Sequence, residues 1–339
     1  MGIARLCNTD LMRQDFRYLT RCVLGFLSLC AVAGAATPGV TTPGVTTPGV
    51  ATPGTSASRQ EPKGPTMPQV LAGTTPADWR ALDPENTLYV ELPTGRVIID
   101  LAPEFAPLHV RNIKTLAKSG YYDGLAVIRE QDNYVAQWGD PENRHPIPAG
   151  IGKTAPEFDT APPAHIVFTR LPDGDVYAPE VGFAGGFPVA RSEGLHRMWL
   201  AHCYGMVGVG RDMDVESGSG TELYVVIGHA PRHLDRNVAL VGRVVKGVEL
   251  LSGLPRGGGE MGMYTKSESP VPIKSIRLAA DVPAAQRADL EVMRTDTPAF
   301  EALIESRRNR PEEFFVVPSG HIDLCNVPIP VRQRPAHSP

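Results

Sequence analysis

Short apolar runs of strand length recur through the middle of the chain and limit its fold more than any other feature. The first two, residues 87–92 and 96–101, alternate apolar and polar side chains and are joined by Pro93-Thr94-Gly95, a pattern typical of a β-hairpin. Later runs occupy residues 126–128, 134–138, 198–203, 205–209, 222–228, 239–245 and 272–281. Many short strands with few helices predict a closed or nearly closed β structure.

One amphipathic helix is predicted directly after the hairpin. It begins at Pro107, because proline is accepted at the first helical position. Val110, Ile113 and Leu116 share one face at helical spacing, and Gly120 supplies the stop. This helix is expected to cover one side of the β structure.

Two other regions carry weaker patterns. Residues 141–195 are expected to be rich in loops, with turns at LPDGD and GFAGGFP. Residues 282–339 are expected to form a C-terminal extension, with a helix from about residue 284 to 308 and a Pro-rich end from residue 317. The extension carries no motif, and packing against the β structure is its expected role.

The N-terminal 36 residues have the pattern of a signal peptide. Three arginines precede an apolar run, residues 22–36, that is too short to span a bilayer comfortably and ends in Ala33-Gly34-Ala35, a cleavage pattern. We therefore expect export, with the periplasm as the compartment. An uncleaved anchor, a lipid anchor at Cys30 and a start at Met12 are the alternatives.

A five-residue repeat follows, TPGVTTPGVTTPGVATPG, at residues 37–54. Each proline removes a backbone donor and each glycine adds freedom, so neither helix nor sheet is expected. The segment lacks the bulky apolar side chains of a core, and we expect a disordered linker over residues 37–78. Folded sequence would then occupy residues 79–281.

Charge and cysteine content exclude several classes of function. The formal net charge is −4, which does not favour a nucleic-acid or anionic-membrane partner, and no membrane span is expected after cleavage. Two cysteines, Cys203 and Cys325, remain in the mature chain, and the sequence leaves open whether they pair or are buried separately. Without a CxxC pair, structural zinc and thioredoxin-like chemistry are not expected.

Metal and nucleophile motifs are not found either. Residues 212–223 place acids at alternate positions, as a calcium loop does, but Ser217 and Leu223 stand where glycine and glutamate are needed. The GSG within this segment lacks the strand-turn-helix context of a nucleophile elbow. We therefore expect no metal and no other cofactor.

The stretch AVIREQDNYVAQWGD, residues 126–140, carries polar side chains inside an apolar strand pair. Arg129 and Gln137 could face solvent on an edge strand. However, Tyr134 and Gln137 cannot share one side of a regular strand, so the pattern predicts a bulge or the lip of a pocket.

Several segments, in order, resemble the cyclophilin family of peptidyl-prolyl cis-trans isomerases, in particular an exported, bacterial-like member. They are TGRVIIDLAPEFAPLHVRNIKTLAKSGYYDG, AVIREQDNYVAQWGD, HCYGMVGVGRD, GSGTELYVVIG, HLDRNVALVGRVVKGVELL and SIRLAAD. The resemblance covers about residues 87–281. It implies a mainly β fold, a closed eight-stranded antiparallel β-barrel capped by two helices, which agrees with the strand-rich pattern.

The resemblance assigns roles residue by residue. Arg129 matches the catalytic arginine of the family, and Gln137 matches a glutamine that would orient Arg129 or the peptide. The residues that would line the pocket for the proline ring are Tyr134, Val135, Tyr224 and Leu234.

Five further substrate-binding positions depart from the family pattern. Gly210 and Arg211 stand where Ala-Asn usually bind the substrate backbone. Glu222 replaces a glutamine, His233 stands where tryptophan is common, and Val238 where histidine is common. These departures concern substrate contacts more than the fold.

The resemblance implies an exported isomerase that acts without a cofactor on X-Pro bonds of proline-containing polypeptides, as a monomer. One alternative is a cyclophilin-like binding or chaperone module with weak or no activity, which the departures favour. An unrelated enzyme such as a hydrolase is the other alternative.

Overall fold

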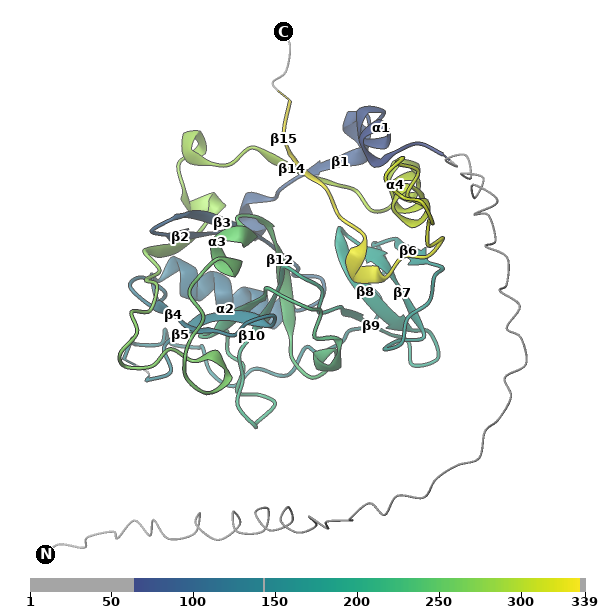
Figure 1. The fold of residues 1–339 in the computed structure, drawn as a ribbon. Coiled ribbons are helices and arrows are strands. Elements are labelled where there is room, and N and C mark those ends of the chain that lie inside the picture. Colours follow the sequence, from purple (N-terminus) through teal and green to yellow (C-terminus); the bar gives the residue numbers. More distant parts are fainter. Residues whose placement is uncertain (1–63, 143, 336–339) are drawn as a thin grey trace, which may run out of the picture. The chain divides into compact units, whose positions relative to one another are not determined.

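The computed structural model describes residues 64–142 and 144–335 of the chain (Figure 1). The expected signal peptide and the five-residue repeat lie outside the described residues. Within them, no helix combines the length and apolar character needed to cross a membrane.

The largest element is a curled sheet of eight antiparallel strands, which confirms the mainly β prediction. Its strand order is β13-β2-β3-β12-β10-β11-β5-β4. The strands are β2 (Thr87–Leu92), β3 (Gly95–Leu101), β4 (Ala126–Glu130), β5 (Val135–Gly139), β10 (Met206–Val209), β11 (Leu223–Val226), β12 (Leu240–Lys246) and β13 (Ser275–Leu278). The predicted hairpin is β2–β3, which turns at Gly95 with a φ of 148°.

The expectation of a closed barrel is wrong, because β4 and β13 remain edge strands. The seam is crossed only before β13, where Ala126 and Pro272 form an isolated bridge. Two backbone hydrogen bonds flank it, Val127 N to Val271 O at 2.9 Å and Ile273 N to Leu125 O at 2.7 Å. These bonds lie on either side of the Ala126–Pro272 pair, so the missing N–H of Pro272 costs no bond to β4. The pairing ends before β13, whose residues pair with β2 alone, and the sheet therefore stays open.

Helix α2 (Pro107–Lys118) forms as predicted and buries Val110, Ile113 and Leu116 in the core of the curled sheet. Gly120, just beyond its end, adopts the left-handed conformation with a φ of 73°. A short helix, α3 (Val248–Ser252), follows β12. The 3-10 turns are η1 (Pro76–Asp78), η2 (Pro84–Asn86), η3 (Arg232–Leu234), η4 (Glu260–Gly262), η5 (Ala279–Asp281), η6 (Ala284–Gln286) and η7 (Leu324–Asn326).

The region expected to consist mainly of loops contains a second sheet instead. Its four antiparallel strands are, in order, β6 (Phe168–Leu171), β7 (Glu180–Ala184), β8 (Phe187–Ser192) and β9 (Arg197–Leu200). The GFAGGFP turn is the β7–β8 connection, with both central glycines at positive φ. Buried Val181, Phe183 and Val189 give these short strands the apolar side chains of a core.

Segments near both ends of the described region form a third sheet, which corrects the expected start of the C-terminal helix. Strand β14 (Leu290–Met293) lies between β1 (Trp79–Ala81) and β15 (Val331–Gln333), so the helix expected from residue 284 begins only at Pro298, as α4 (Pro298–Asn309). Thr297 caps α4, and proline fits only this first turn.

The expected linker is also too long at its C-terminal end. Residues 67–72 form α1 (Met67–Ala72), and its cap, Thr66, exchanges hydrogen bonds with Gln69 in a capping box. Val70 is buried and belongs to the same apolar cluster as residues of α4. Met67 and Leu71 also pack against this cluster, so the capping box and an apolar face together hold α1 beside α4.

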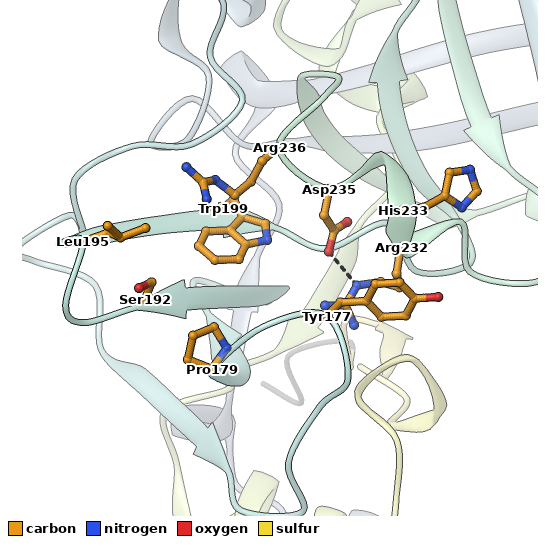
Figure 2. A pocket seen from close by; sticks show the side chains of 9 residues that line it. All are labelled: Tyr177, Pro179, Ser192, Leu195, Trp199, Arg232, His233, Asp235 and Arg236. Atoms are coloured by element: carbon orange, nitrogen blue, oxygen red, sulfur yellow. Dashed lines mark hydrogen bonds and ion pairs between the residues drawn. The ribbon is translucent and has the colours of Figure 1, made fainter.

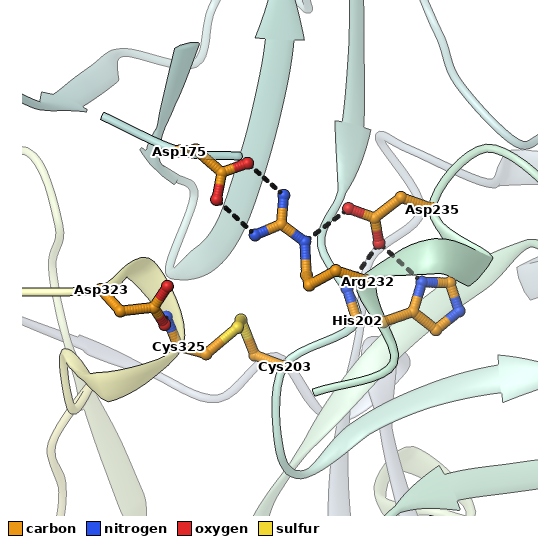
Figure 3. Close-up of a disulfide and its surroundings, with 7 residues drawn as sticks. All are labelled: Asp175, His202, Cys203, Arg232, Asp235, Asp323 and Cys325. Carbon is orange, nitrogen blue, oxygen red and sulfur yellow. Dashed lines mark hydrogen bonds and ion pairs between the residues drawn. A yellow bond between two sulfur atoms is a disulfide. The ribbon is translucent and has the colours of Figure 1, made fainter. Parts of the chain in front are cut away.

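A disulfide joins Cys203 to Cys325, which answers the question that the sequence left open (Figure 3). The Cα atoms lie 5.0 Å apart, and the cysteines are separated by 122 residues. Cys325 lies in η7, where Asp323 accepts a hydrogen bond from its backbone N–H at 2.8 Å. The bond therefore fixes the C-terminal segment to the segment after β9.

Replacing both cysteines by serine should lower the free energy of unfolding by about 2–5 kcal/mol, because the bond closes a long loop in the unfolded chain. Denaturant titration at fixed pH measures the loss. Dithiothreitol should lower the stability of the wild type and leave the double variant unchanged. Equal stability of wild type and variant would contradict a structural role for the bond.

Candidate active site

A groove of about 1150 Å³ runs along β4, β5, β10 and β11 and contains most of the sequence-predicted site. Every one of those residues lines it except His233. They are Arg129, Tyr134, Val135, Gln137, Gly210, Arg211, Glu222, Tyr224, Leu234 and Val238. Their roles stay predictions, but the structure brings them together on one surface.

Arg129 reaches the groove because β4 contains a bulge. The register of β4 and β5 shifts between Val127 and Arg129, which places Arg129 opposite Gln137 and confirms the predicted irregularity. Nε of Arg129 donates to the carbonyl of Met261 at 2.7 Å, Nη1 donates to Oε1 of Gln137 at 3.3 Å, and Nη2 donates to Gln131. Three partners therefore orient the guanidinium.

Gln137 links Arg129 to Glu222. Its Nε2 donates to Oε2 of Glu222 at 2.8 Å, while its Oε1 accepts from Arg129, so the orientation of the amide is fixed. Burial raises the pKa of the Glu222 carboxyl. Glu222 packs over Gly139, where an added Cβ would lie 2.3 Å from Cγ of Glu222.

The two residues at the substrate-backbone positions are engaged within the protein. Gly210 donates its backbone N–H to the carbonyl of Glu222 at 2.9 Å. Arg211 donates to the carbonyl oxygens of Asn237, at 2.9 Å, and Asp212, at 2.7 Å. These two hydrogen bonds orient the Arg211 side chain, which lines the groove.

An apolar cup adjoins the guanidinium. Val135 and Tyr224 form its buried wall, and Tyr134, Leu234 and Val238 contribute partly buried side chains. The guanidinium of Arg129 lies 5.4 Å from the centre of the Tyr134 ring. A polar group beside an apolar cup is the arrangement that the sequence led us to expect.

Gly208 is required by the ring of Tyr224. A Cβ at this position would lie 2.2 Å from Cζ of that ring, so no other residue fits while the ring keeps its place. No sequence motif marks this requirement, because Gly208 and Tyr224 become neighbours only through the β10–β11 pairing.

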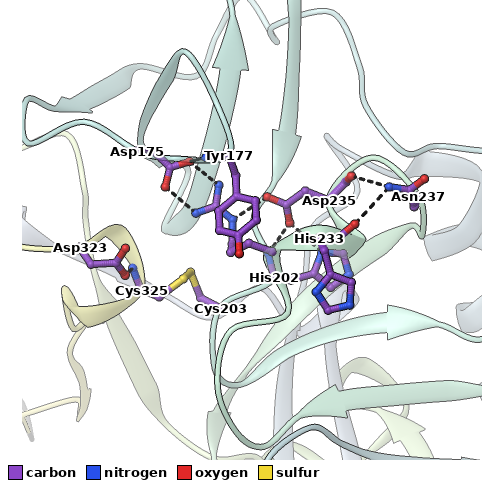
Figure 4. A network of polar contacts seen from close by, with 10 residues as sticks. Asp175, Tyr177, His202, Cys203, His233, Asp235, Asn237, Asp323 and Cys325 are labelled. Atoms are coloured by element: carbon purple, nitrogen blue, oxygen red, sulfur yellow. Dashed lines mark hydrogen bonds and ion pairs between the residues drawn. A yellow bond between two sulfur atoms is a disulfide. The ribbon is translucent and has the colours of Figure 1, made fainter. Parts of the chain in front are cut away.

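The hydroxyl of Tyr224 begins a buried polar chain, which we call the relay: Tyr224, His202, Asp235, Arg232 and Asp175. Figure 4 shows the part of it that contains His202, Asp235 and Asp175. Oη of Tyr224 lies 2.8 Å from Nε2 of His202, and Nδ1 of His202 lies 2.9 Å from Oδ1 of Asp235. Burial lowers the pKa of His202 and raises that of Tyr224. Both side chains are therefore neutral, with Nδ1–H donating to Asp235 and the Tyr224 hydroxyl donating to Nε2.

The far end of the relay reaches the four-stranded sheet. Nε of Arg232 donates to Oδ2 of Asp235 at 2.6 Å, and its Nη1 and Nη2 donate to the two carboxylate oxygens of Asp175 at 3.0 Å each. Asp175 lies in the β6–β7 connection. No sequence motif pointed to His202, Arg232 or Asp175, because they are distant in the chain and meet only in the folded protein.

His233 is placed differently from the other predicted residues. Its ring is stacked on that of Tyr134, with centroids 6.4 Å apart and planes 2° from parallel, but it lines a separate cavity beside the groove. The sequence also missed Met261 and Met263, which line the groove from the loop that orients Arg129. Met261 and Met263 are far from residues 126–140 in the chain, so only the folded structure brings them to the groove.

That loop is attached to the outer edge of β4. Gly257 donates its backbone N–H to the carbonyl of Glu130 at 3.0 Å, and Nη1 of Arg256 donates to the fully buried Glu130 carboxylate at 2.9 Å. Burial outweighs the charge of Arg256, with Asp132 also opposing ionisation, and raises the pKa of Glu130 to about 8. Tyr264 is the other titratable group that faces Glu130.

Among the described residues, no group of three His, Cys, Asp or Glu side chains is arranged to hold a metal ion. The groove instead offers a fixed cation, neutral amides and an apolar cup. Such a site can bind an extended polypeptide and polarise one of its amides.

Comparison with known proteins places this groove in a family context. The family described as "Cyclophilin type peptidyl-prolyl cis-trans isomerase/CLD" matches residues 87–278. A "Probable peptidyl-prolyl cis-trans isomerase" of Brucella suis is 28% identical over 178 residues, which cover 52% of this chain and 75% of that protein. "Peptidyl-prolyl cis-trans isomerase ppi1" of Schizosaccharomyces pombe is 48% identical over 54 residues, covering 15% of this chain and 35% of that protein.

Among solved structures, cyclophilin AquaCyp293 from Hirschia baltica has a TM-score of 0.63 and 28% sequence identity. The match covers 80% of this chain and 98% of that one. Coverage of this extent includes residues beyond 87–278, so parts of the chain outside the family match are shared as well.

Removing the Tyr224 hydroxyl should destabilise the protein. The substitution Tyr224→Phe leaves Nε2 of the buried His202 without its donor, and we expect a loss of about 1–3 kcal/mol in the free energy of unfolding. Tyr204→Phe is the matched control, because this exposed hydroxyl makes no hydrogen bond among the described residues. Equal stability of the two variants, measured by denaturant titration, would contradict the relay.

Glu130 should make stability fall as pH rises. From a reference value of 4.5 up to its folded pKa of about 8, the folded state keeps a proton that the unfolded state has released. The free energy of unfolding of the wild type should therefore fall relative to that of Glu130→Gln by on the order of 2–4 kcal/mol across this range. Denaturant midpoints of both proteins from pH 5 to 9 measure this difference, and parallel pH profiles would refute the assignment.

Proposed function

The chain belongs to the cyclophilin-type peptidyl-prolyl cis-trans isomerase family and is therefore an isomerase; on this premise, we propose that Arg129 and the adjoining cup catalyse rotation about X-Pro bonds of polypeptides. The observation that best supports this proposal is that three protein partners hold the Arg129 guanidinium at the edge of an apolar cup.

The chemistry requires no covalent step. Amide resonance sets a barrier of about 18–20 kcal/mol, and a twisted amide nitrogen gains a lone pair as conjugation is lost. A site that binds this twisted state more tightly than either planar isomer accelerates the exchange. A hydrogen-bond donor near the prolyl amide and an apolar surface for the ring are sufficient for this purpose.

Arg129 retains donors for the substrate. A guanidinium carries five N–H groups, and the three hydrogen bonds to Met261, Gln137 and Gln131 leave two unused by these partners. The guanidinium stays charged at any physiological pH, so it can donate to the amide nitrogen or the prolyl carbonyl without deprotonation. Gln137 orients the guanidinium toward the groove, and Val135, Tyr224 and Leu234 contact the proline ring of the substrate.

We further propose that the protein is exported and assists folding of exported proteins, as a monomer. The apolar run at residues 22–36 supports export, and so does the disulfide between Cys203 and Cys325, because such bonds persist in oxidising compartments. Cell fractionation with an antibody to the folded domain tests this, and a cytosolic location would contradict it.

The substitution Arg129→Ala should lower kcat/KM for X-Pro peptides by about 10²–10³-fold, because it removes the donor to the twisted amide. The measurement is a protease-free isomerisation assay on a series of X-Pro peptides. Arg111→Ala, an exposed arginine of α2, is the matched control and should keep the wild-type rate.

An unchanged rate in Arg129→Ala would refute the catalytic role of this residue. A wild type that binds the peptides but turns none over would instead favour a binding or chaperone module. Thermal unfolding of each variant checks that any loss of rate is not a loss of fold.

A further inference from the structure

A second cavity, of about 290 Å³, lies beside the groove (Figure 2). Its walls come from the four-stranded sheet and from the connection between β11 and β12 that contains η3. Tyr177, Pro179 and Leu195 belong to connections of the four-stranded sheet, Trp199 belongs to β9, and His233 belongs to η3. This volume is at the lower end of the range for ligand pockets, so the cavity is suited to a single side chain of a bound polypeptide.

The cavity adjoins the candidate active site at η3. Adjacent residues of this turn face the two spaces, Leu234 lining the groove and His233 lining the cavity. The ring of His233 also stacks on that of Tyr134, which lines the groove. The cavity is therefore within reach of a polypeptide whose proline occupies the cup.

The relay holds the cavity in shape. The bidentate ion pair between Arg232 and Asp175, whose side chains are each 3% exposed, fixes the β6–β7 connection against η3. The guanidinium of Arg232 lies 5.2 Å from the centre of the Tyr177 ring. These contacts within the protein hold the walls of the cavity in place.

The lining favours an aromatic occupant. Tyr177 and Leu195 are left 53% and 60% exposed, although their side chains are large and apolar. The charged groups around them are already paired: Arg232 with Asp175 and Asp235, and Arg236 with Asp159 at 2.8 Å. Guanidinium groups beside ring faces attract aromatic rings and repel basic side chains.

We propose that this cavity is a specificity subsite that binds an aromatic side chain of the same polypeptide whose proline occupies the cup. The proposal rests on the proposed function, because it needs a proline-containing chain in the groove. The rings of Tyr134 and His233 are 6.4 Å apart, a distance that an extended chain covers in roughly two residues. The aromatic residue therefore lies roughly two to five residues from the proline.

The test uses peptides with one proline in an alanine-rich background and one phenylalanine placed two to five residues away on either side. Both the Kd and the isomerisation rate are measured against the all-alanine peptide. We expect phenylalanine at one position, or at two adjacent positions on one side, to improve Kd and kcat/KM by roughly tenfold. Lysine at the same position should give no gain.

Variants then locate the effect. Tyr177→Ala and Leu195→Ala should each reduce the ratio between the phenylalanine and alanine peptides to below about threefold, because each removes part of the cavity wall. Val176→Ala is the matched control, since Val176 is 92% exposed on the same connection and does not line the cavity. It should keep the wild-type ratio.

The possible failures are distinguishable. Turnover of proline peptides without any positional preference for phenylalanine overturns the subsite and leaves the proposed function intact. A preference that persists in both Tyr177→Ala and Leu195→Ala also overturns it, because the ring then binds elsewhere. Absence of both binding and turnover for every peptide overturns the proposed function together with the subsite.

Discussion

The candidate active site depends on the hydrogen bonds that the buried carboxylate of Asp235 accepts. One oxygen accepts from the backbone N–H and from Nδ1 of His202, both at 2.9 Å, and the other accepts from Nε of Arg232 at 2.6 Å. Burial alone would raise the pKa of this carboxyl, but the hydrogen bond from His202 and the charge of Arg232 hold it below its usual range. Buried charges are stable only when they are paired and hydrogen-bonded in this way, and losing one partner is costly.

Through Asp235, the four-stranded sheet, the 3-10 turn η3 and the cup are joined into one polar network. Tyr224 lies at one end of it, as a wall of the cup, and Asp175 lies at the other, in the connection that carries Tyr177. The disulfide constrains the same part of the network, because Cys203 directly follows His202 and is bonded to Cys325. The added sheet is therefore part of the structure that supports the groove, and it also supplies the walls of the neighbouring cavity.

The sequence predicted the elements whose determinants are local. The β2–β3 hairpin, helix α2 and the irregular strand pair at Arg129 and Gln137 follow from turn residues, capping and alternation. The second sheet was missed because its short strands lie among glycines and prolines typical of loops. The closed barrel was wrong because the pairing across the seam stops before β13, and no local sequence pattern reveals where pairing between distant strands ends. His202 and Asp235 could not be paired in advance, since 33 residues separate them and only the fold brings them together.

Direct observation of Arg129 during turnover tests the central claim. The measurement is ¹⁵N NMR of its guanidinium, assigned by comparison with Arg129→Lys, during titration with a proline peptide whose cis and trans signals are resolved. We predict that the Arg129 signals shift on binding while exchange between the two isomers accelerates. Accelerated exchange with unmoved Arg129 signals would contradict it, because catalysis would then occur without the group that the groove presents to the substrate.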